Sequence, residues 1–163
     1  DEILHPHNLK VCFMAEYFLP DINSLKELPC QYDIHILHPE DFQAFYVPQW
    51  SNALCADRKE LDVLGVGAYE SGNLIGLAAC SADCDTMYQI GVDVLPEHRR
   101  QGVAAALPSR LAMEILALGR VPFYCAAWCN LKSVRNAIKS GFRPAWVELT
   151  AREITFVDKM NRR

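Results

Sequence analysis

Most of the chain has the hydrophobic pattern of β-strands. Short apolar or alternating runs bounded by turn residues are typical of strands. Such runs cover residues 32–37, 64–70, 74–81, 87–94, 122–128, 142–150 and 154–157. Ser71-Gly72-Asn73 separates two of these runs and predicts a tight hairpin turn. The pattern therefore predicts a sheet in which neighbouring strands are largely antiparallel.

Two segments have helical patterns. Residues 102–118 predict a helix that ends at Gly119, and residues 131–140 predict a second that ends at Gly141, because glycine commonly follows a helix C-terminus. Pro108 falls inside the first helix and removes a backbone donor, so we expect a kink or a frayed first turn there. Helices mixed with a meander of strands predict an α+β fold with a mixed, largely antiparallel central sheet flanked by helices.

The first part of the chain is less regular. Residues 2–30 show no clear period, and prolines bracket a possible short helix over residues 22–28. His38-Pro39-Glu40-Asp41 opens another short helix. The first residue is Asp rather than Met. We therefore expect residues 1–31 to be an N-terminal extension, the end of an upstream domain, and residues 32–163 to form the main domain.

Composition narrows the class of protein. The 163 residues are 51% apolar and 22% charged, as in globular proteins, and no apolar run is long enough to cross a bilayer. Seven cysteines without a secretory segment indicate reduced thiols and a cytoplasmic protein. The Cys80/Cys84 and Cys125/Cys129 pairs raise the alternative of a zinc site. The second pair is too far apart in an extended strand and the first supplies only two ligands, so we expect no metal.

The net charge of −4 is unevenly distributed. Residues 1–96 carry 4 basic and 15 acidic side chains, whereas residues 97–143 carry 8 basic and 2 acidic ones. A basic segment in an acidic chain favours a site for a small anion over a nucleic-acid surface. The alternative is a chance cluster of solvated helix faces.

The basic segment contains Val94-Leu95-Pro96-Glu97-His98-Arg99-Arg100-Gln101-Gly102-Val103-Ala104, which leaves a strand and enters a helix. We call residues 99–104 the phosphate turn. Unpaired amides at a helix N-terminus, the helix dipole and two arginines suit a pyrophosphate. The alternative is a plain connection with solvated arginines.

These residues resemble the signature of the GNAT superfamily of acetyl-CoA-dependent N-acetyltransferases, Val-x-Pro-x-x-Arg-x-x-Gly-x-Gly/Ala. A second block is similar to that family's Asn-x-x-Ala/Ser…Gly-Phe segment and consists of Asn130, Ser133, Gly141 and Phe142. The resemblance covers residues 86–142, extends back to residue 32, and implies the family's α+β acyltransferase fold.

The resemblance implies a role for each matching residue. The acetyl-CoA pyrophosphate would be held by the backbone of Arg99, Arg100, Gln101, Gly102, Val103 and Ala104. Pantetheine would pair with Val92, Asp93 and Val94, with the Val94 N–H stabilising the oxyanion. Asn130 and Ser133 would contact pantetheine. The alternative for these two is a helix N-cap, which one Asn can combine with binding.

The usual acid–base residues are missing. Where many relatives carry a Glu base and a Tyr acid, this chain has Cys125 and Ala137. Tyr88 is a candidate water-mediated proton relay, and Cys125 or Cys129 a candidate acid. The alternatives are a half-buried strand tyrosine and core cysteines.

The first functional hypothesis is acetyl transfer from acetyl-CoA to a small-molecule or peptide amine in a ternary complex, without nucleic acid or membrane partners. The first alternative is a non-catalytic acyl-CoA-binding regulatory or structural module. The second is a partner-binding domain that no longer binds CoA.

Overall fold

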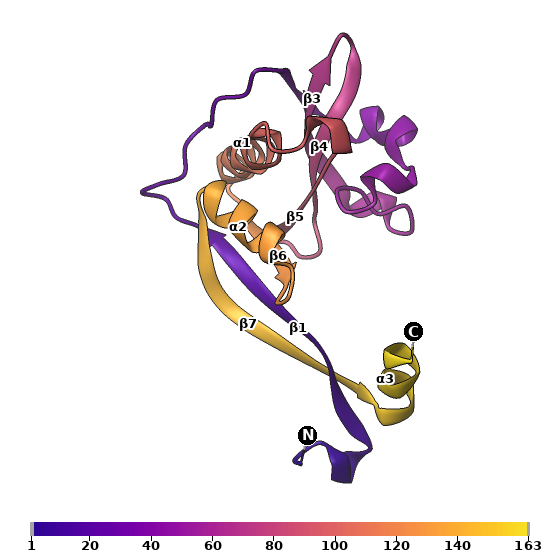
Figure 1. Ribbon diagram of the computed structural model, residues 1–163. Coiled ribbons are helices and arrows are strands. Elements are labelled where there is room, and N and C mark those ends of the chain that lie inside the picture. Colours follow the sequence, from indigo (N-terminus) through magenta and orange to yellow (C-terminus); the bar gives the residue numbers. More distant parts are fainter. Residues whose placement is uncertain (1, 163) are drawn as a thin grey trace.

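A seven-stranded mixed sheet forms the centre of the computed structural model, which describes residues 2–162 (Figure 1). All neighbouring strands are antiparallel except β5 and β6, which confirms the predicted largely antiparallel α+β class. In order across the sheet, the strands are β2 (Asp33–Leu37), β3 (Asp62–Glu70), β4 (Asn73–Ser81), β5 (Met87–Val94), β6 (Val121–Ala127), β1 (Leu9–Pro20) and β7 (Phe142–Glu153).

The two faces of the sheet are covered differently. Helices α1 (Val103–Ala117) and α2 (Leu131–Lys139) lie on one face, where Leu107, Leu111 and Ala137 belong to the larger buried cluster. Short 3-10 helices cover part of the other face and bury Phe42 and Trp50 in a second cluster. These helices are η2 (Pro39–Phe45), η3 (Pro48–Trp50) and η4 (Lys59–Leu61), while η1 (His5–His7) and η5 (Pro96–His98) lie elsewhere.

Strand β1 was not predicted. It lies between β6 and β7, with residues Ala15–Phe18 paired to β6 and nearly its whole length paired to β7. A strand with neighbours on both edges and partial cover on both faces needs no clean alternation of polar and apolar positions. The helix expected over residues 22–28 is wrong, because this segment is turn and irregular structure. The boundary at residue 31 stays a prediction, but residues 9–20 are part of the sheet.

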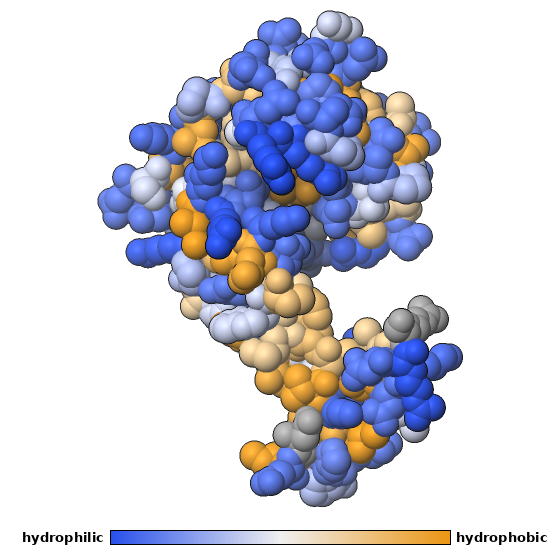
Figure 2. Space-filling view, viewed as in Figure 1, coloured by the Kyte–Doolittle hydropathy of each residue, from blue (hydrophilic) through white to orange (hydrophobic). Residues whose placement is uncertain are grey.

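The ends of the chain form a projecting ribbon. β1 and β7 run away from the rest of the sheet together, with η1 and α3 (Ile154–Asn161) at the far end (Figure 1). Figure 2 shows hydrophobic side chains along this ribbon, and Phe13, Leu149 and Phe156 are about half exposed. The strand predicted at residues 154–157 is wrong. Pairing with β1 ends at Glu153, so the next residues have no strand partner, and they form a helix that buries Val157.

Pro108 is accommodated inside α1, which is one uninterrupted helix from Val103. Proline has no N–H, so the Ala104 carbonyl four residues earlier loses its helical donor. Asn136 of α2 replaces that donor, since its Nδ2 donates to the Ala104 oxygen at 2.6 Å. The side chain of one helix therefore completes the backbone hydrogen bonding of the other.

This pairing predicts a coupled effect on stability. We expect Asn136→Ala to lower the free energy of unfolding by about 1–2 kcal/mol, because it leaves a part-buried carbonyl unpaired. In a Pro108→Ala background the new backbone amide donates to the Ala104 carbonyl. There, Asn136→Ala should lower the free energy of unfolding by less than about 0.5 kcal/mol. Urea denaturation of the four proteins measures this difference. Equal costs in both backgrounds would contradict the assignment.

Candidate functional site

The sheet opens between β5 and β6. The two strands pair from Met87 with Val121 to Ile90 with Tyr124, and their pairing then ends although both strands continue. We call the unpaired region between residues 91–94 of β5 and 125–127 of β6 the split. Unpaired strand edges inside a sheet present hydrogen-bonding groups to a ligand. The split is therefore a place where an extended ligand can add to the sheet.

The polar groups that face the split can be assigned from the neighbouring ladder. Leu95 donates to the Ile75 carbonyl at 2.9 Å, and Leu95 and Ile75 continue the unbroken register of β5 with β4. Antiparallel pairs alternate between hydrogen-bonded and non-hydrogen-bonded. Asp93 and Gly91 therefore bond to β4, whereas the N–H groups of Val92 and Val94 point toward the split. Both have the position expected for residues that pair with pantetheine.

The phosphate turn begins where the split ends. Its amides from Arg100 to Ala104 donate to no acceptor within residues 2–162. The Arg99 amide, in contrast, donates to the Pro96 carbonyl at 3.3 Å. Arg100 has φ 63° and Gly102 has φ 89°, so left-handed residues bend the backbone just before α1. Such a run of amides at a helix N-terminus forms an anion-binding concavity. The expected cradle is present, without the Arg99 amide.

Side chains hold this turn in place. Arg99 Nε donates to the Val94 carbonyl at 3.0 Å, which ties the turn to the end of β5. The Gln101 side chain donates to the Glu97 carbonyl and accepts from the Tyr32 hydroxyl at 2.5 Å, and His98 also lies against Tyr32. The side chains of Arg99 and Gln101 therefore stabilise the conformation of the turn to which these residues belong. Arg100 is exposed and forms no ion pair with any described residue.

The turn fits a diphosphate sterically as well as chemically. A Cβ built on Gly102 would meet nothing within 4 Å, so the space in front of this residue is open. A glycine suits this position because its φ of 89° is a backbone conformation that residues with a side chain rarely adopt. The donors present, five amides and the Arg100 guanidinium, are of the kind that binds phosphate oxygens. The residues fit the phosphate end of CoA.

Asp93 has a different role from the expected one. Its carboxylate accepts from the Asn52 amide at 2.8 Å, from Asn52 Nδ2 at 2.6 Å and from the Ala53 amide at 3.1 Å. Its backbone groups face β4. Asp93 therefore fixes the segment after η3 against the face of β5 opposite α1, and it does not face the split.

Asn130 and Ser133 form the helix cap. Asn130 is the N-cap of α2, and its Oδ1 accepts from the Ser133 amide at 3.2 Å. The Ser133 hydroxyl is hydrogen-bonded to the Tyr124 hydroxyl at 2.9 Å. The capping alternative is confirmed for both residues. A contact of Asn130 with pantetheine stays a prediction, since the side chain is exposed.

The candidate acid–base residues are placed on different faces. Cys125 is the first residue of β6 beyond the pairing with β5, so it lies at the narrow end of the split. Burial raises the pKa of its thiol, which is therefore protonated at neutral pH. Tyr88 packs against the buried cluster under α1, and Ala137 is fully buried there. Cys129 is exposed beyond the end of β6.

Residues that the sequence did not single out surround Cys125. Tyr17 of β1 is its cross-strand neighbour and donates to Glu148 Oε2 of β7 at 2.9 Å. Burial is the largest cause of a raised Tyr17 pKa, followed by the hydrogen bond with Glu148. No local sequence signal links positions 17, 125 and 148, because only the strand register brings them together.

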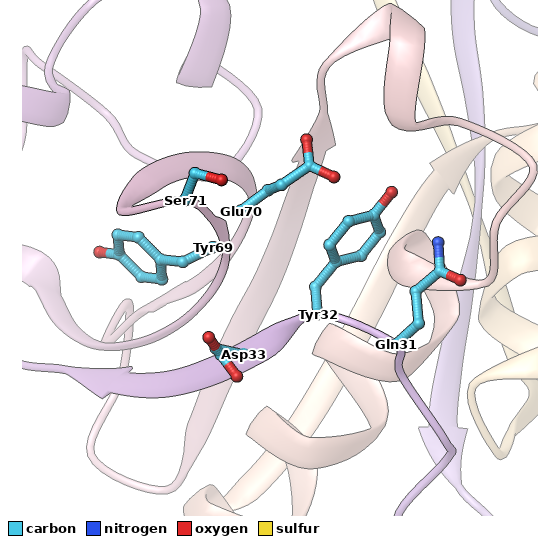
Figure 3. Close-up of a pocket in the computed structure, with 6 residues that line it drawn as sticks. All are labelled: Gln31, Tyr32, Asp33, Tyr69, Glu70 and Ser71. Atoms are coloured by element: carbon cyan, nitrogen blue, oxygen red, sulfur yellow. The ribbon is translucent and has the colours of Figure 1, made fainter.

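A pocket of about 340 Å³ lies beside the phosphate turn but is unsuited to phosphate. Figure 3 shows Tyr32 and Glu70 pointing in one direction and Tyr69 pointing away from them. Asp33 and Glu70 give the lining negative charge, which would repel a phosphate. The phosphate turn, and not this pocket, is therefore the candidate site for an anion.

Neither a metal centre nor a membrane span is found in residues 2–162. No three His, Cys, Asp or Glu side chains come together there in a group that could hold a metal ion. No helix among these residues is both long and apolar enough to cross a bilayer.

Comparisons with known proteins agree with this geometry. The family model for GNAT acetyltransferase matches residues 14–145. A GCN5-related N-acetyltransferase-like protein from Streptococcus suis superposes with TM-score 0.69 at 21% identity, over 93% of this chain and 66% of that one. A GCN5-related N-acetyltransferase from Sphaerobacter thermophilus gives TM-score 0.67 at 14% identity, over 94% and 55%.

The chain covers only part of each solved structure that it matches. A tandem GNAT protein from the clavulanic acid biosynthesis pathway gives TM-score 0.63 at 14% identity, and the present chain covers 57% of it. No curated protein sequence matches. The chain thus spans less than two thirds of these solved structures, and at such identities they show a shared fold. The family match, which includes β5, the split, the phosphate turn and α2, places this chain in the GNAT acetyltransferase family.

Proposed function

We propose that the protein transfers acetyl from acetyl-CoA to an amine by direct attack in a ternary complex. The observation that carries the proposal is the run of unpaired amides from Arg100 to Ala104 at the mouth of the split. Those amides and Arg100 would hold the pyrophosphate, and the inward-facing groups of Val92 and Val94 would hold pantetheine. Acetyl-CoA supplies the activated thioester.

The geometry favours Val92 over Val94 as the residue that stabilises the oxyanion. Val92 is the first residue beyond Ile90 whose N–H faces the split, and so it lies near the narrow end. Val94 is adjacent to the phosphate turn, and its carbonyl is occupied by Arg99. Pantetheine separates the thioester from the pyrophosphate, so the reacting carbonyl belongs at the end farther from the turn.

Proton transfer is assigned from protonation states. An alkylammonium must lose a proton before its nitrogen can attack, and water in the split is the simplest acceptor. The Cys125 thiol is protonated at neutral pH because burial raises its pKa, so it can donate a proton to the departing thiolate but cannot serve as a base. Tyr88 is the weaker candidate, since it packs under α1.

A titration with acetyl-CoA tests the proposal. We expect millimolar acetyl-CoA to raise the melting temperature by about 5 °C, and pantetheine, which has no pyrophosphate, to have little effect. Release of free thiol should then follow addition of a primary amine from a panel. No thermal shift would contradict CoA binding.

The non-catalytic alternative is favoured by one observation, the replacement of the usual base and acid by Cys125 and Ala137. It predicts the same thermal shift with acetyl-CoA. It differs in predicting no thiol release above the rate without enzyme for any amine. The two hypotheses are therefore separated by turnover and not by binding.

A further inference from the structure

A row of aromatic rings ends at a carboxylate on the last strand of the sheet. Phe123 of β6 stacks on Tyr17 of β1 with ring centroids 6.0 Å apart, and Tyr17 stacks on Trp146 of β7 at 4.9 Å. The Tyr17 hydroxyl donates to Glu148 at 2.9 Å. We call Phe123, Tyr17, Trp146 and Glu148 the β7 cluster. It combines ring faces with a negative charge.

The β7 cluster lies on the face of the sheet that α1 and α2 leave uncovered. Phe18 and Tyr124 are cross-strand neighbours in the buried cluster under α1. Side chains alternate between faces along a strand, so the adjacent pair Tyr17 and Cys125 projects from the opposite face. Cys125 also marks the narrow end of the split. The cluster therefore borders the split on the side opposite the helices.

No cationic side chain among the described residues forms an ion pair with Glu148. Its two oxygens accept from neutral hydroxyls, those of Tyr17 at 2.9 Å and Thr150 at 3.2 Å. Glu148 is exposed, and the side chain of Trp146 is 41% exposed beside it. A carboxylate next to an exposed aromatic side chain has the negative charge and the ring that attract an alkylammonium ion.

The distance from the split determines which ammonium can bind there. Glu148 is on β7, and β1 lies between β7 and β6. Strands are about 4.8 Å apart, so roughly 10 Å separates the backbone of β7 from that of β6. Glu148 cannot reach an amine that attacks a thioester beside β5. Its position suits a second cationic group at the other end of the acceptor.

We propose that the β7 cluster binds the distal ammonium of a diamine acceptor, with Glu148 as the specificity-determining residue. This inference rests on the proposed acetyl transfer. The distal ammonium stays protonated at Glu148 while the other nitrogen, after losing a proton to water, attacks the thioester carbon. The N–C bond forms, the C–S bond breaks, and sulfur leaves with the electron pair. The nitrogen then loses a second proton, and protonation of the CoA thiolate gives the free thiol.

A binding experiment tests the site without turnover. The indole N–H resonance of Trp146, assigned with Trp146→Phe, is followed while hexane-1,6-diamine or hexylamine is added in the presence of CoA. We expect the diamine to bind about tenfold more tightly than the monoamine, and Glu148→Gln to remove this difference. Glu153→Gln, the same substitution on the same strand, is the matched control and should preserve it. An unmoved indole, or equal affinities in the wild type, overturns the proposal.

Kinetics separate this inference from the proposed function. Glu148→Gln should raise KM for hexane-1,6-diamine about tenfold, leave kcat nearly unchanged, and leave KM for hexylamine unchanged. Acetylation of hexane-1,6-diamine and hexylamine with equal KM would overturn the proposed diamine site but would support the proposed acetyl transfer. Absence of thiol release together with diamine binding at Trp146 would contradict acetyl transfer but support the cation site.

Discussion

Gly102→Ala is expected to weaken acetyl-CoA binding by about 100-fold. Gly102 has φ 89°, so alanine adds backbone strain, and relief of that strain would shift the amides of the phosphate turn. A hydrogen bond to a charged group contributes about 1.5–3 kcal/mol, so displacing the pyrophosphate from one or two amides is enough for this loss. Isothermal titration calorimetry with acetyl-CoA measures the change.

Gly119→Ala is the matched control. Gly119 also has a positive φ, 70°, and nothing within 4 Å of a built Cβ, but it lies at the opposite end of α1. Both variants should lose about 1 kcal/mol of stability from strain. Only Gly102→Ala should lose affinity. An unchanged dissociation constant in Gly102→Ala would mean that the phosphate turn is not the CoA site.

Gly91→Ala is expected to lower the free energy of unfolding by about 3 kcal/mol or more. A Cβ at this position would lie 1.8 Å from the Asn52 carbonyl oxygen and 2.8 Å from its carbon. The obstacle is backbone, and the three hydrogen bonds that the Asp93 carboxylate accepts hold it in place. The segment must therefore move away from β5, which breaks these bonds and disturbs buried Trp50. Urea denaturation provides the measurement.

Gly65→Ala is the comparison for this substitution. Gly65 is also a strand glycine, and its closest neighbour would be the Phe42 ring at 3.0 Å. The Phe42 ring is buried and the Ala78 carbonyl oxygen would lie 3.3 Å away, but contacts of this length need only a small shift, so the expected loss is about 1 kcal/mol. Similar losses for the two variants would contradict the conclusion that Asp93 clamps the Asn52 segment rigidly against β5.

The parts of the fold that depend on residues close together in the sequence could be predicted from it. The strand at residues 87–94, the helix from Gly102 and the helix after Asn130 all agree with the structure. Each has a cause that lies within the segment: the alternation of polar and apolar residues in the strand, a left-handed glycine before the first helix, and a side-chain cap at the second. The phosphate turn was identified for the same reason, because its amides, glycine and arginines are consecutive in the chain.

Elements that depend on distant partners could not be predicted. β1 is a strand because β6 and β7 lie on its two sides, and residues 154–157 are helical because β1 has no residue left to pair with them. Asp93 was expected to face the ligand, but the ladder with β4 turns it toward Asn52. In each case the deciding contact joins segments far apart in the chain.

The sequence alone determined the family resemblance and the candidate phosphate turn, since eleven consecutive residues, 94–104, contain the signature, its glycine and its arginines. The tertiary structure decided which amides of the turn stay unpaired and that the N–H groups of Val92 and Val94 face the split. It also decided that Tyr17 lies beside both Cys125 and Glu148. Strand register sets these relations, and register arises from pairing across the whole sheet, so no local pattern contains it.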